Sequence, residues 1–303
     1  DKIVAAAKKA FLFNGIGTNP EKNLKNLTDD LYKKFLIYQN DIFNQFNLST
    51  ELSKNNYFDR KIAEWITSCI CDRIIFEFYT EKGIIPDFGA GHSIGLINAS
   101  ACFGAIQFNK AYELILKCRN ILENLQKSNR KLDIGIIIGM DFDSVQNLIN
   151  SEKAEDSVEI GSVNSSVSVM ICGADDCISH ILHKASEEGA LKVIKYNIGI
   201  AFHNRIIKSF SDSFVSYCCQ MDFKAPLYPI ISAFDQHIIT EKQDLLHENQ
   251  INIVTPIRWD LTIKKLMKLG VTEFYDMSAD GAVSKFSRIN KKKCRIYTLN
   301  QIY

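Results

Sequence analysis

Residues 87–95 read Asp-Phe-Gly-Ala-Gly-His-Ser-Ile-Gly, and this stretch decides the fold that the sequence predicts. The apolar pair Ile84 and Ile85 leads into it, and a helix-compatible segment follows it. Its last five residues fit the pattern G-x-S-x-G, in which a serine lies on a tight turn between a strand and a helix. The glycines are needed because side chains would clash in so sharp a turn. We therefore interpret Ser93 as a candidate nucleophile; the alternative is an ordinary glycine-rich turn with a harmless serine.

The composition excludes several classes of partner. Of the 303 residues, 46% are hydrophobic and 23% are charged, which is typical of a soluble globular protein. The formal charge of +1 gives no general electrostatic footprint for nucleic acid, and Lys291–Lys293 is interpreted as a solvated basic run. No apolar run approaches the length of a membrane span. We expect neither a nucleic-acid partner nor a membrane partner.

The cysteines give no sign of a metal site or of a disulfide framework. There are nine of them, and the close pairs have spacings that do not match zinc ligands: Cys69 and Cys71, Cys172 and Cys177, Cys218 and Cys219. Reduced thiols in a cytoplasmic protein explain them best. The sequence therefore predicts a cytoplasmic location and no bound metal.

Residues 10–126 predict a strand, a loop and then helices, with one helical stretch at 26–46. Residues 10–13 form a short apolar run, and the turn cluster of residues 14–20 follows it directly. That cluster does not fit G-x-G-x-x-G, so we reject a dinucleotide site. Residues 59–79 and 108–126 carry apolar side chains at helical spacing.

The middle of the chain predicts a separate small unit. Strands are expected over residues 134–140, 158–163, 167–172 and 190–196, with helices over 141–150 and 175–188. The order β-α-β-β-α-β is the ferredoxin-like arrangement. We therefore predict a ferredoxin-like subdomain at 132–197, inserted into a larger catalytic domain formed by 1–131 and 198–303. In that larger domain, 204–219 is predicted as a helix and 226–231 as a strand.

Several motifs follow one another in a fixed order. Residues 10–17 read Ala-Phe-Leu-Phe-Asn-Gly-Ile-Gly, 91–95 read Gly-His-Ser-Ile-Gly, 201–203 read Ala-Phe-His, and 256–259 read Pro-Ile-Arg-Trp. With Asn164-Ser165 between them, the set resembles the malonyl-CoA:acyl-carrier-protein transacylase family, which includes the acyltransferases of polyketide synthases. The resemblance implies an α/β-hydrolase-like large domain with a parallel sheet, plus the inserted ferredoxin-like subdomain.

The resemblance also implies a role for each residue of the site. Ser93 would attack an acyl thioester, and because a free serine is a weak nucleophile, His203 would take its proton as the base. The backbone N–H groups of Ile16 and Ile94 would form the oxyanion hole. The backbone carbonyl of Asn252 would orient the histidine in place of a triad aspartate, with no role for the asparagine side chain. Substrate contacts are implied for three residues: Arg119, Phe202 and Asn164.

Three departures from the family pattern bear on the acyl group. The loop glutamine of the family is Ile16 here, and the glutamate that usually follows the serine motif is Leu96. The family arginine that holds a malonyl carboxylate falls on Cys118 by gapless counting, and Arg119 is the next residue. Either the register slips by one residue or recognition of a dicarboxylate is lost. Ile94 and Phe202 argue against a loss of dicarboxylate recognition, because they resemble residues of malonyl-selecting members.

The leading hypothesis is therefore a serine acyltransferase. It would move an acyl group, malonyl by resemblance, from coenzyme A to the phosphopantetheine thiol of an acyl carrier protein. Coenzyme A thioester would be a substrate, and no cofactor would be bound. Two alternatives stay open: an acyl-carrier-protein thioesterase that uses the same Ser93 and His203, and a non-catalytic module that binds carrier protein.

Overall fold

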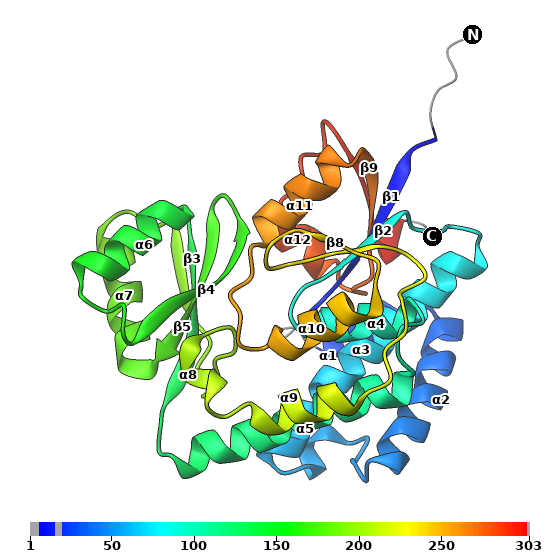
Figure 1. Cartoon of the computed structure of the whole chain (residues 1–303), viewed down its shortest axis with the longest axis horizontal. Helices are drawn as coiled ribbons and strands as arrows, with labels where there is room; N and C mark the ends of the chain where they lie inside the picture. Colours follow the sequence, from blue (N-terminus) through cyan, green and yellow to red (C-terminus); the bar gives the residue numbers. More distant parts are fainter. Residues whose placement is uncertain (1–5, 16–19, 302–303) are drawn as a thin grey trace.

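The computed structural model describes residues 6–15 and 20–301, which form a large part and a small part side by side (Figure 1). The large part is built on a six-stranded sheet with the order β10-β9-β1-β2-β7-β8. Its strands are β1 (Lys8–Phe13), β2 (Phe88–Gly91), β7 (Ile230–Ile231), β8 (Ile238–Ile239), β9 (Val271–Asp276) and β10 (Arg295–Tyr297). All pairings are parallel except that of β7 with β8.

The central strand β1 brings the ends of its neighbours together. Phe13 pairs with Gly91 at the end of β2, and Leu12 pairs with Asp276 at the end of β9. The run from Ala10 to Phe13 is fully buried, as expected for a parallel strand covered on both faces. The loops that leave these strands consequently meet at one edge of the sheet, which is where open α/β sheets bind their ligands.

Helices cover the sheet of the large part and connect its strands. Asn56 begins the longest of them, α3, by accepting a hydrogen bond from the backbone of Asp59 at 2.9 Å. Every residue of α4 is buried, so this helix runs through the core directly behind Ser93. The helical elements are α1 (Pro20–Lys25), α2 (Asp29–Gln45), η1 (Leu52–Lys54), α3 (Tyr57–Glu81), α4 (Ile94–Cys102), α5 (Phe108–Lys127), α8 (Arg205–Lys208), α9 (Asp212–Gln220), α10 (Lys242–Ile251), α11 (Trp259–Lys268), α12 (Ala282–Ser287) and η2 (Leu299–Gln301).

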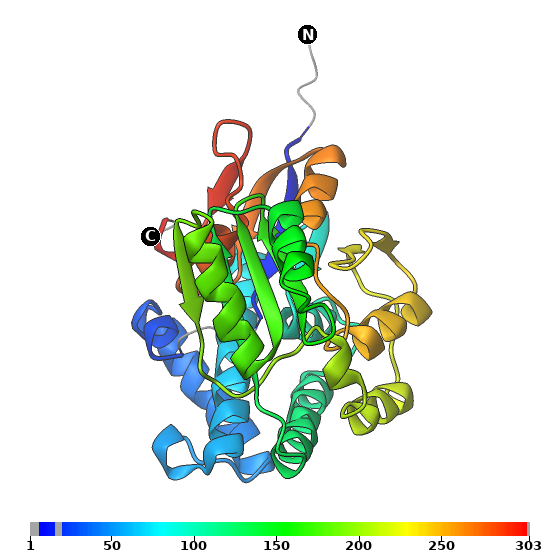
Figure 2. The same cartoon turned by 90° about the vertical axis from the view of Figure 1, so that its left-hand side faces the viewer.

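The small part is an antiparallel sheet with the order β4-β5-β3-β6, covered by two helices on its outer face (Figure 2). Because side chains alternate between the faces of a strand, β3 serves two environments. Ile137 packs with α6 and α7, whereas Ile136 points to the other face, toward the large part. The elements are β3 (Leu132–Ile138), α6 (Phe142–Ser151), β4 (Val158–Ser165), β5 (Ser168–Ala174), α7 (Asp175–Glu187) and β6 (Lys192–Lys195).

The predicted fold class is confirmed. A mainly parallel sheet with helices forms the large part, and the β-α-β-β-α-β order of the small part has the ferredoxin-like strand arrangement. The division of the chain at residues 132 and 197 remains a proposal. Two predicted elements were wrong. The helix over 204–219 is two helices, because the chain turns between Lys208 and Asp212. Only the last two residues of 226–231 form a strand, since Pro229 has no N–H to donate.

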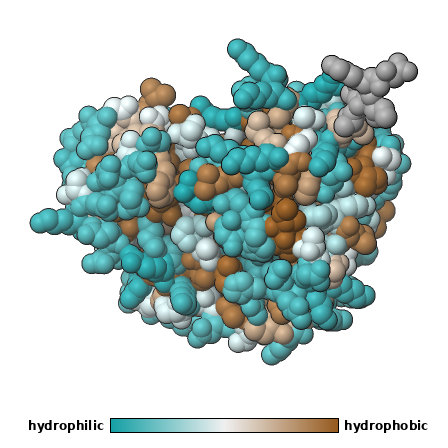
Figure 3. Space-filling view, turned by 45° about the horizontal axis from the view of Figure 1, so that its top comes forward, coloured by the Kyte–Doolittle hydropathy of each residue, from teal (hydrophilic) through white to brown (hydrophobic). Residues whose placement is uncertain are grey.

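The surface is mainly hydrophilic on the face seen in Figure 3, where hydrophobic residues form smaller groups between charged and polar ones. Among the described residues, no helix has both the length and the apolar character needed to span a membrane. Each of the nine cysteines is unpaired.

The close approach of α4 to the end of β1 gives a test of the packing. A Cβ at Gly95 would lie 2.4 Å from the carbonyl oxygen of Asn14, which is backbone and cannot rotate away. Helix propensity alone predicts that Gly95→Ala stabilises the protein by up to about 1 kcal/mol. We expect the clash to dominate and Gly95→Ala to destabilise by about 1–3 kcal/mol in urea denaturation.

The control for this substitution is Gly83→Ala. Gly83 has no neighbouring atom within 4 Å of an added Cβ, but its φ of +78° lies in the left-handed region. The loss of stability in Gly83→Ala should therefore be limited to the backbone strain of about 1–2 kcal/mol. A stabilising Gly95→Ala would contradict the described packing of α4 on β1.

Candidate active site

Ser93 lies at the sharp turn between β2 and α4, and its backbone is strained. Its φ of 58° and ψ of −124° fall outside the regions that a serine adopts freely. Gly91 permits the turn, because a Cβ there would lie 2.3 Å from the backbone nitrogen of Leu96. The turn raises the Ser93 side chain above the end of the sheet at the N-terminus of α4, as in a nucleophile elbow.

His203 lies directly against Ser93, although 110 residues separate them in the sequence. The Ser93 hydroxyl and His203 Nε2 are 2.7 Å apart. On the other side of the ring, His203 Nδ1 is 3.0 Å from the carbonyl oxygen of Thr255, and this contact assigns the proton to Nδ1. Nε2 then carries the lone pair and accepts from the Ser93 hydroxyl, which is the arrangement of a general base.

Burial keeps the imidazole of His203 neutral. Loss of solvation lowers the pKa of His203 to about 3, with a smaller lowering from His92, while the backbone carbonyls of Thr255 and Asn252 oppose the shift. The free base is therefore present throughout the neutral pH range. When the base takes a proton from Ser93, these carbonyls stabilise the resulting imidazolium.

His92 does not act as a second base but joins the turn to the small part. Its Nε2 lies 3.0 Å from Asn164 Oδ1 and 3.1 Å from Ser162 Oγ, both on β4. The ring packs against Trp259 and Phe286. Burial lowers the pKa of His92 to about 4, so the ring is neutral. The predicted substrate residue Asn164 thus holds His92 and also lines the cavity in front of Ser93.

Asn252 contributes to the site through its side chain as well as through its backbone carbonyl. The carbonyl bonded to His203 Nδ1 belongs to Thr255, and that of Asn252 contributes only a weaker interaction with the ring. The reason is that α10 ends at Ile251, with Asn252 as its C-cap, and the turn that follows brings Thr255 to the ring. The Asn252 side chain is fully buried, and its Nδ2 donates to the Ser93 carbonyl at 2.9 Å. It therefore holds the strained turn itself.

The oxyanion hole is described only in part. Ile94 follows Ser93 as the first residue of α4, so its N–H lies at the helix N-terminus beside the serine. Ile16 lies outside the described residues. The loop that leads to it is anchored by the buried Asp72, whose Oδ2 accepts the N–H of Asn14 at 3.0 Å.

A cavity of about 350 Å³ opens in front of Ser93 and His203. The inner face of the small sheet forms an apolar wall, to which β3, β5 and β6 contribute Ile134, Ile136, Ile138, Met170 and Ile194, and Tyr196 directly after β6 adds to it. Phe202, predicted to contact substrate, lines the cavity and packs edge-on against Trp65. The cationic side chains that line it are Lys285 and Arg288, at the end of α12.

Arg119, the predicted carboxylate ligand, is not among the residues that line this cavity. Its guanidinium pairs with Asp59 on α3 and with Glu123 one helical turn along α5. The neighbouring Cys118 is completely buried. The helix therefore presents a thiol to the core at this point and turns the guanidinium toward its two carboxylate partners.

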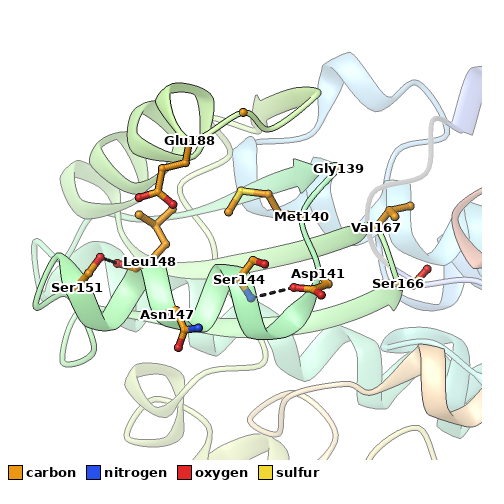
Figure 4. Close-up of a pocket in the computed structure, with 11 residues that line it drawn as sticks. Gly139, Met140, Asp141, Ser144, Asn147, Leu148, Ser151, Ser166, Val167 and Glu188 are labelled. Atoms are coloured by element: carbon orange, nitrogen blue, oxygen red, sulfur yellow. Dashed lines mark hydrogen bonds between the residues drawn. The ribbon is translucent and has the colours of Figure 1, made fainter.

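A second cavity, of about 640 Å³, lies on the small part beside α6 (Figure 4). The residues lining it include no histidine, cysteine, lysine or arginine, and Asp141 there is engaged in capping α6 through the backbone of Ser144. It holds no nucleophile paired with a base. The pair of Ser93 and His203 therefore marks the candidate active site.

Sequence reasoning missed three contributors to the site. Thr255 acts through its carbonyl, which any residue type could supply, and the one available signal was its position directly before the Pro-Ile-Arg-Trp motif. Ser162 acts on His92 from a strand 70 residues away. Asp72 lies on the apolar helix α3 and is buried there. An acidic residue in so apolar a stretch of sequence was itself a signal that its carboxylate accepts a hydrogen bond from another segment, here from the N–H of Asn14.

Sequence comparison finds related proteins, although no family model matches the chain. A protein of Bacillus subtilis (strain 168) named malonyl CoA-acyl carrier protein transacylase is 26% identical over 219 residues, covering 71% of this chain and 69% of that protein. A protein of the same name from Staphylococcus aureus (strain MRSA252) is 22% identical over 226 residues, 73% of each chain.

Solved structures share the fold over almost the whole chain. FabD from Acinetobacter baumannii superposes with a TM-score of 0.82 at 19% identity, covering 97% of this chain and 95% of that one. A malonyl-transacylase solved in complex with a type II polyketide synthase acyl-carrier protein gives a TM-score of 0.80 at 18% identity, over 96% of each chain. These comparisons confirm the resemblance and the fold class that the sequence predicted.

The depressed pKa of His203 predicts how the reactivity of Ser93 varies with pH. Because the base form persists down to about pH 3, the rate of Ser93 labelling by a fluorophosphonate should stay level to below pH 5. An unperturbed histidine would instead give a midpoint near its ordinary value of about 6.5. Mass spectrometry of the labelled protein measures the rate, with Ser93→Ala as the unlabelled control, and a midpoint near 6.5 would contradict the burial of this ring.

The contact of Asn252 with the turn predicts an effect of its side chain. Asn252→Ala removes the donor to the Ser93 carbonyl and should slow fluorophosphonate labelling by about ten-fold, because the turn loses one fixed orientation. Gln250→Ala, two residues earlier on α10, removes a half-buried amide that bonds to Cys219 instead of the turn; it is the matched control and should leave the rate unchanged. Equal labelling rates for both variants would show that the Asn252 side chain does not support the turn at Ser93.

Proposed function

We propose that this chain, which belongs by sequence and fold with the malonyl CoA-acyl carrier protein transacylases, is a serine acyltransferase. It takes an acyl group from coenzyme A and passes it to the phosphopantetheine thiol of an acyl carrier protein. The observation that carries the proposal is the line of contacts from Ser93 through His203 to the Thr255 carbonyl. Such a line serves a serine nucleophile, and a binding module has no use for it.

The first half of the reaction forms an acyl-enzyme. His203 Nε2 takes the proton of the Ser93 hydroxyl as its oxygen attacks the thioester carbonyl, which produces a tetrahedral oxyanion and an imidazolium. The N–H of Ile94 faces the developing negative charge. When the C–S bond breaks, the imidazolium returns the proton to the leaving coenzyme A thiolate, and the acyl group remains as an ester of Ser93.

The second half reverses these steps with a different thiol. The phosphopantetheine thiol of the carrier protein gives its proton to His203 and attacks the ester carbonyl. The C–O bond to Ser93 then breaks, and His203 returns the proton to the serine oxygen. Coenzyme A is a substrate in this cycle rather than a bound cofactor, and no step requires a metal.

The acyl group that we propose is malonyl, since the related proteins carry that name. Arg119 is engaged with Asp59 and Glu123, so its guanidinium is not the group that would meet a malonyl carboxylate. Lys285 and Arg288 line the cavity and would supply positive charge instead. The apolar wall of β3 favours the competing case of an acyl chain without a carboxylate, because burying an unpaired carboxylate there is costly.

The acceptor that we propose is a carrier protein, as in the complex of the structural relative solved with its acyl-carrier protein. Such carriers are generally acidic, and Lys285 and Arg288 would place positive charge at the mouth of the cavity. No observation favours water as the acceptor over a thiol. We propose a cytoplasmic location for the same reason as before, the nine unpaired cysteines.

A transfer assay tests the proposal. The protein is mixed with holo acyl carrier protein and, separately, malonyl-, acetyl- or hexanoyl-CoA, and the carrier is followed by intact mass. We expect rapid appearance of the malonyl-carrier mass and little free malonate. Ser93→Ala should lower the rate by at least about a thousand-fold and His203→Ala by about a hundred-fold or more, because each removes one half of the pair.

The controls separate the competing readings. His180→Ala removes an exposed histidine on α7 and should leave transfer unchanged. Transfer of hexanoyl but not malonyl groups would keep the acyltransferase and overturn malonyl as its substrate. Release of free acid without carrier acylation would identify a thioesterase, and full activity of Ser93→Ala would end the serine mechanism.

A further inference from the structure

Three side chains of metal-ligating types come together where the hairpin between β7 and β8 meets α10. Asp235 and His237 come from the hairpin that joins β7 to β8, and Glu248 comes from α10. One potential ligand atom of each lies within 4.8 Å of the other two. We propose that Asp235, His237 and Glu248 bind one divalent metal ion, with Zn²⁺ as the best match to one imidazole and two carboxylates.

The distances suit a metal ion with little rearrangement. His237 Nδ1 lies 2.5 Å from Asp235 Oδ1 and 3.8 Å from Glu248 Oε1. In a tetrahedral zinc site, with bonds of about 2.1 Å, neighbouring ligand atoms are about 3.4 Å apart. The two observed separations lie on either side of that value. Shifts of about 1 Å in the two exposed side chains would therefore form the site.

Glu248 provides the independent sign that a ligand is needed. Its side chain is only 2% exposed, and Oε2 is buried without a hydrogen-bond partner among the described residues. Burying an oxygen of a carboxylate without a partner costs free energy. The carboxylate has a hydrogen bond with Ser232, but Oε2 stays unpaired. A divalent ion at Oε1 or Oε2 would remove this cost.

The charges of the cluster also lack a cation. Within residues 6–15 and 20–301, neither Asp235 nor Glu248 forms an ion pair with a lysine or arginine, and His237 is the partner of both. With both carboxylates ionised, they would carry a charge of −2, which a divalent ion would neutralise.

The hairpin holds two of the ligands ready. Ser232 Oγ accepts the N–H groups of Phe234 and Asp235 at 3.0 and 3.2 Å, and Asp235 Oδ1 accepts the N–H of His237 at 3.1 Å. The Asp235 and His237 side chains are 69% and 39% exposed. The cluster is therefore open to solvent on one side, where water can complete the coordination of the ion.

The consequence of metal binding is structural. The ion would fasten the hairpin to α10, and the end of α10 carries Asn249, which donates to Ser100 on α4 at 3.2 Å, and Asn252, which donates to Ser93. Thr255, whose carbonyl contacts His203 Nδ1, follows three residues after Asn252 in the same segment. This proposal departs from the expectation of a protein without metal, which considered only the cysteine spacings, and it does not depend on the proposed acyl transfer.

The test measures binding of zinc alone to the full chain. The protein is freed of metal with a chelator and titrated with Zn²⁺ by isothermal titration calorimetry, and thermal unfolding is followed with and without the ion. We expect one ion per chain with a dissociation constant in the micromolar range or below, and a rise in melting temperature with zinc concentration. Glu248→Gln and His237→Ala should each weaken binding by at least about ten-fold.

Matched variants keep the result unambiguous. Glu248→Gln preserves the shape of a buried side chain and removes its charge, so folding should be retained and is checked by circular dichroism. His247→Ala removes the exposed histidine beside Glu248 on α10 and should leave the affinity unchanged. No binding at tens of micromolar zinc would overturn the proposal. So would binding that survives both ligand substitutions, since it would then be adventitious, at exposed histidines such as His180 and His183.

Discussion

The strained backbone of Ser93 is the constraint on which the rest of the site depends. A serine at a φ of 58° costs on the order of 1–3 kcal/mol, so the surroundings must hold it there. Asn252 bonds to its carbonyl, Gly95 brings α4 against the end of β1, and His203 accepts from its hydroxyl. Each contact comes from a different segment of the chain. The same contacts therefore stabilise the fold and position the Ser93 side chain.

The small part belongs to the site because it is joined to the large part through polar contacts close to the serine. His92, the neighbour of Ser93, bonds to Ser162 and Asn164 on β4. On the same strand, the N–H of Val163 donates to the carbonyl of Ile257, two residues after Thr255. The inner face of the small sheet then closes the cavity as an apolar wall. A movement of the small part would thus reach both Ser93 and the segment whose carbonyl bonds to His203.

The sequence predicted what depends on residue type and local order. The glycines around Ser93 predicted the turn, and the alternation of strands and helices in the middle of the chain predicted the ferredoxin-like unit. It missed the carbonyl of Thr255, which bonds to His203 Nδ1, because a backbone carbonyl leaves no signature in the sequence; the predicted carbonyl of Asn252 adds a weaker contact. It also left the direction of Arg119 open, since one residue turns a helical side chain by about 100°. The direction is set by ion pairs of Arg119 with Asp59 and Glu123, and the pairing with Asp59 depends on how α5 packs against α3.

We propose that Ser93 carries the acyl group as a covalent ester between the two half-reactions. The most direct measurement mixes the protein with acyl-CoA in the absence of carrier protein, quenches with acid within milliseconds to seconds, and maps the modified peptide by tandem mass spectrometry. We expect one acyl group per chain, attached to the peptide that contains Ser93. Attachment to a cysteine, or carrier acylation without any acyl-enzyme, would contradict it.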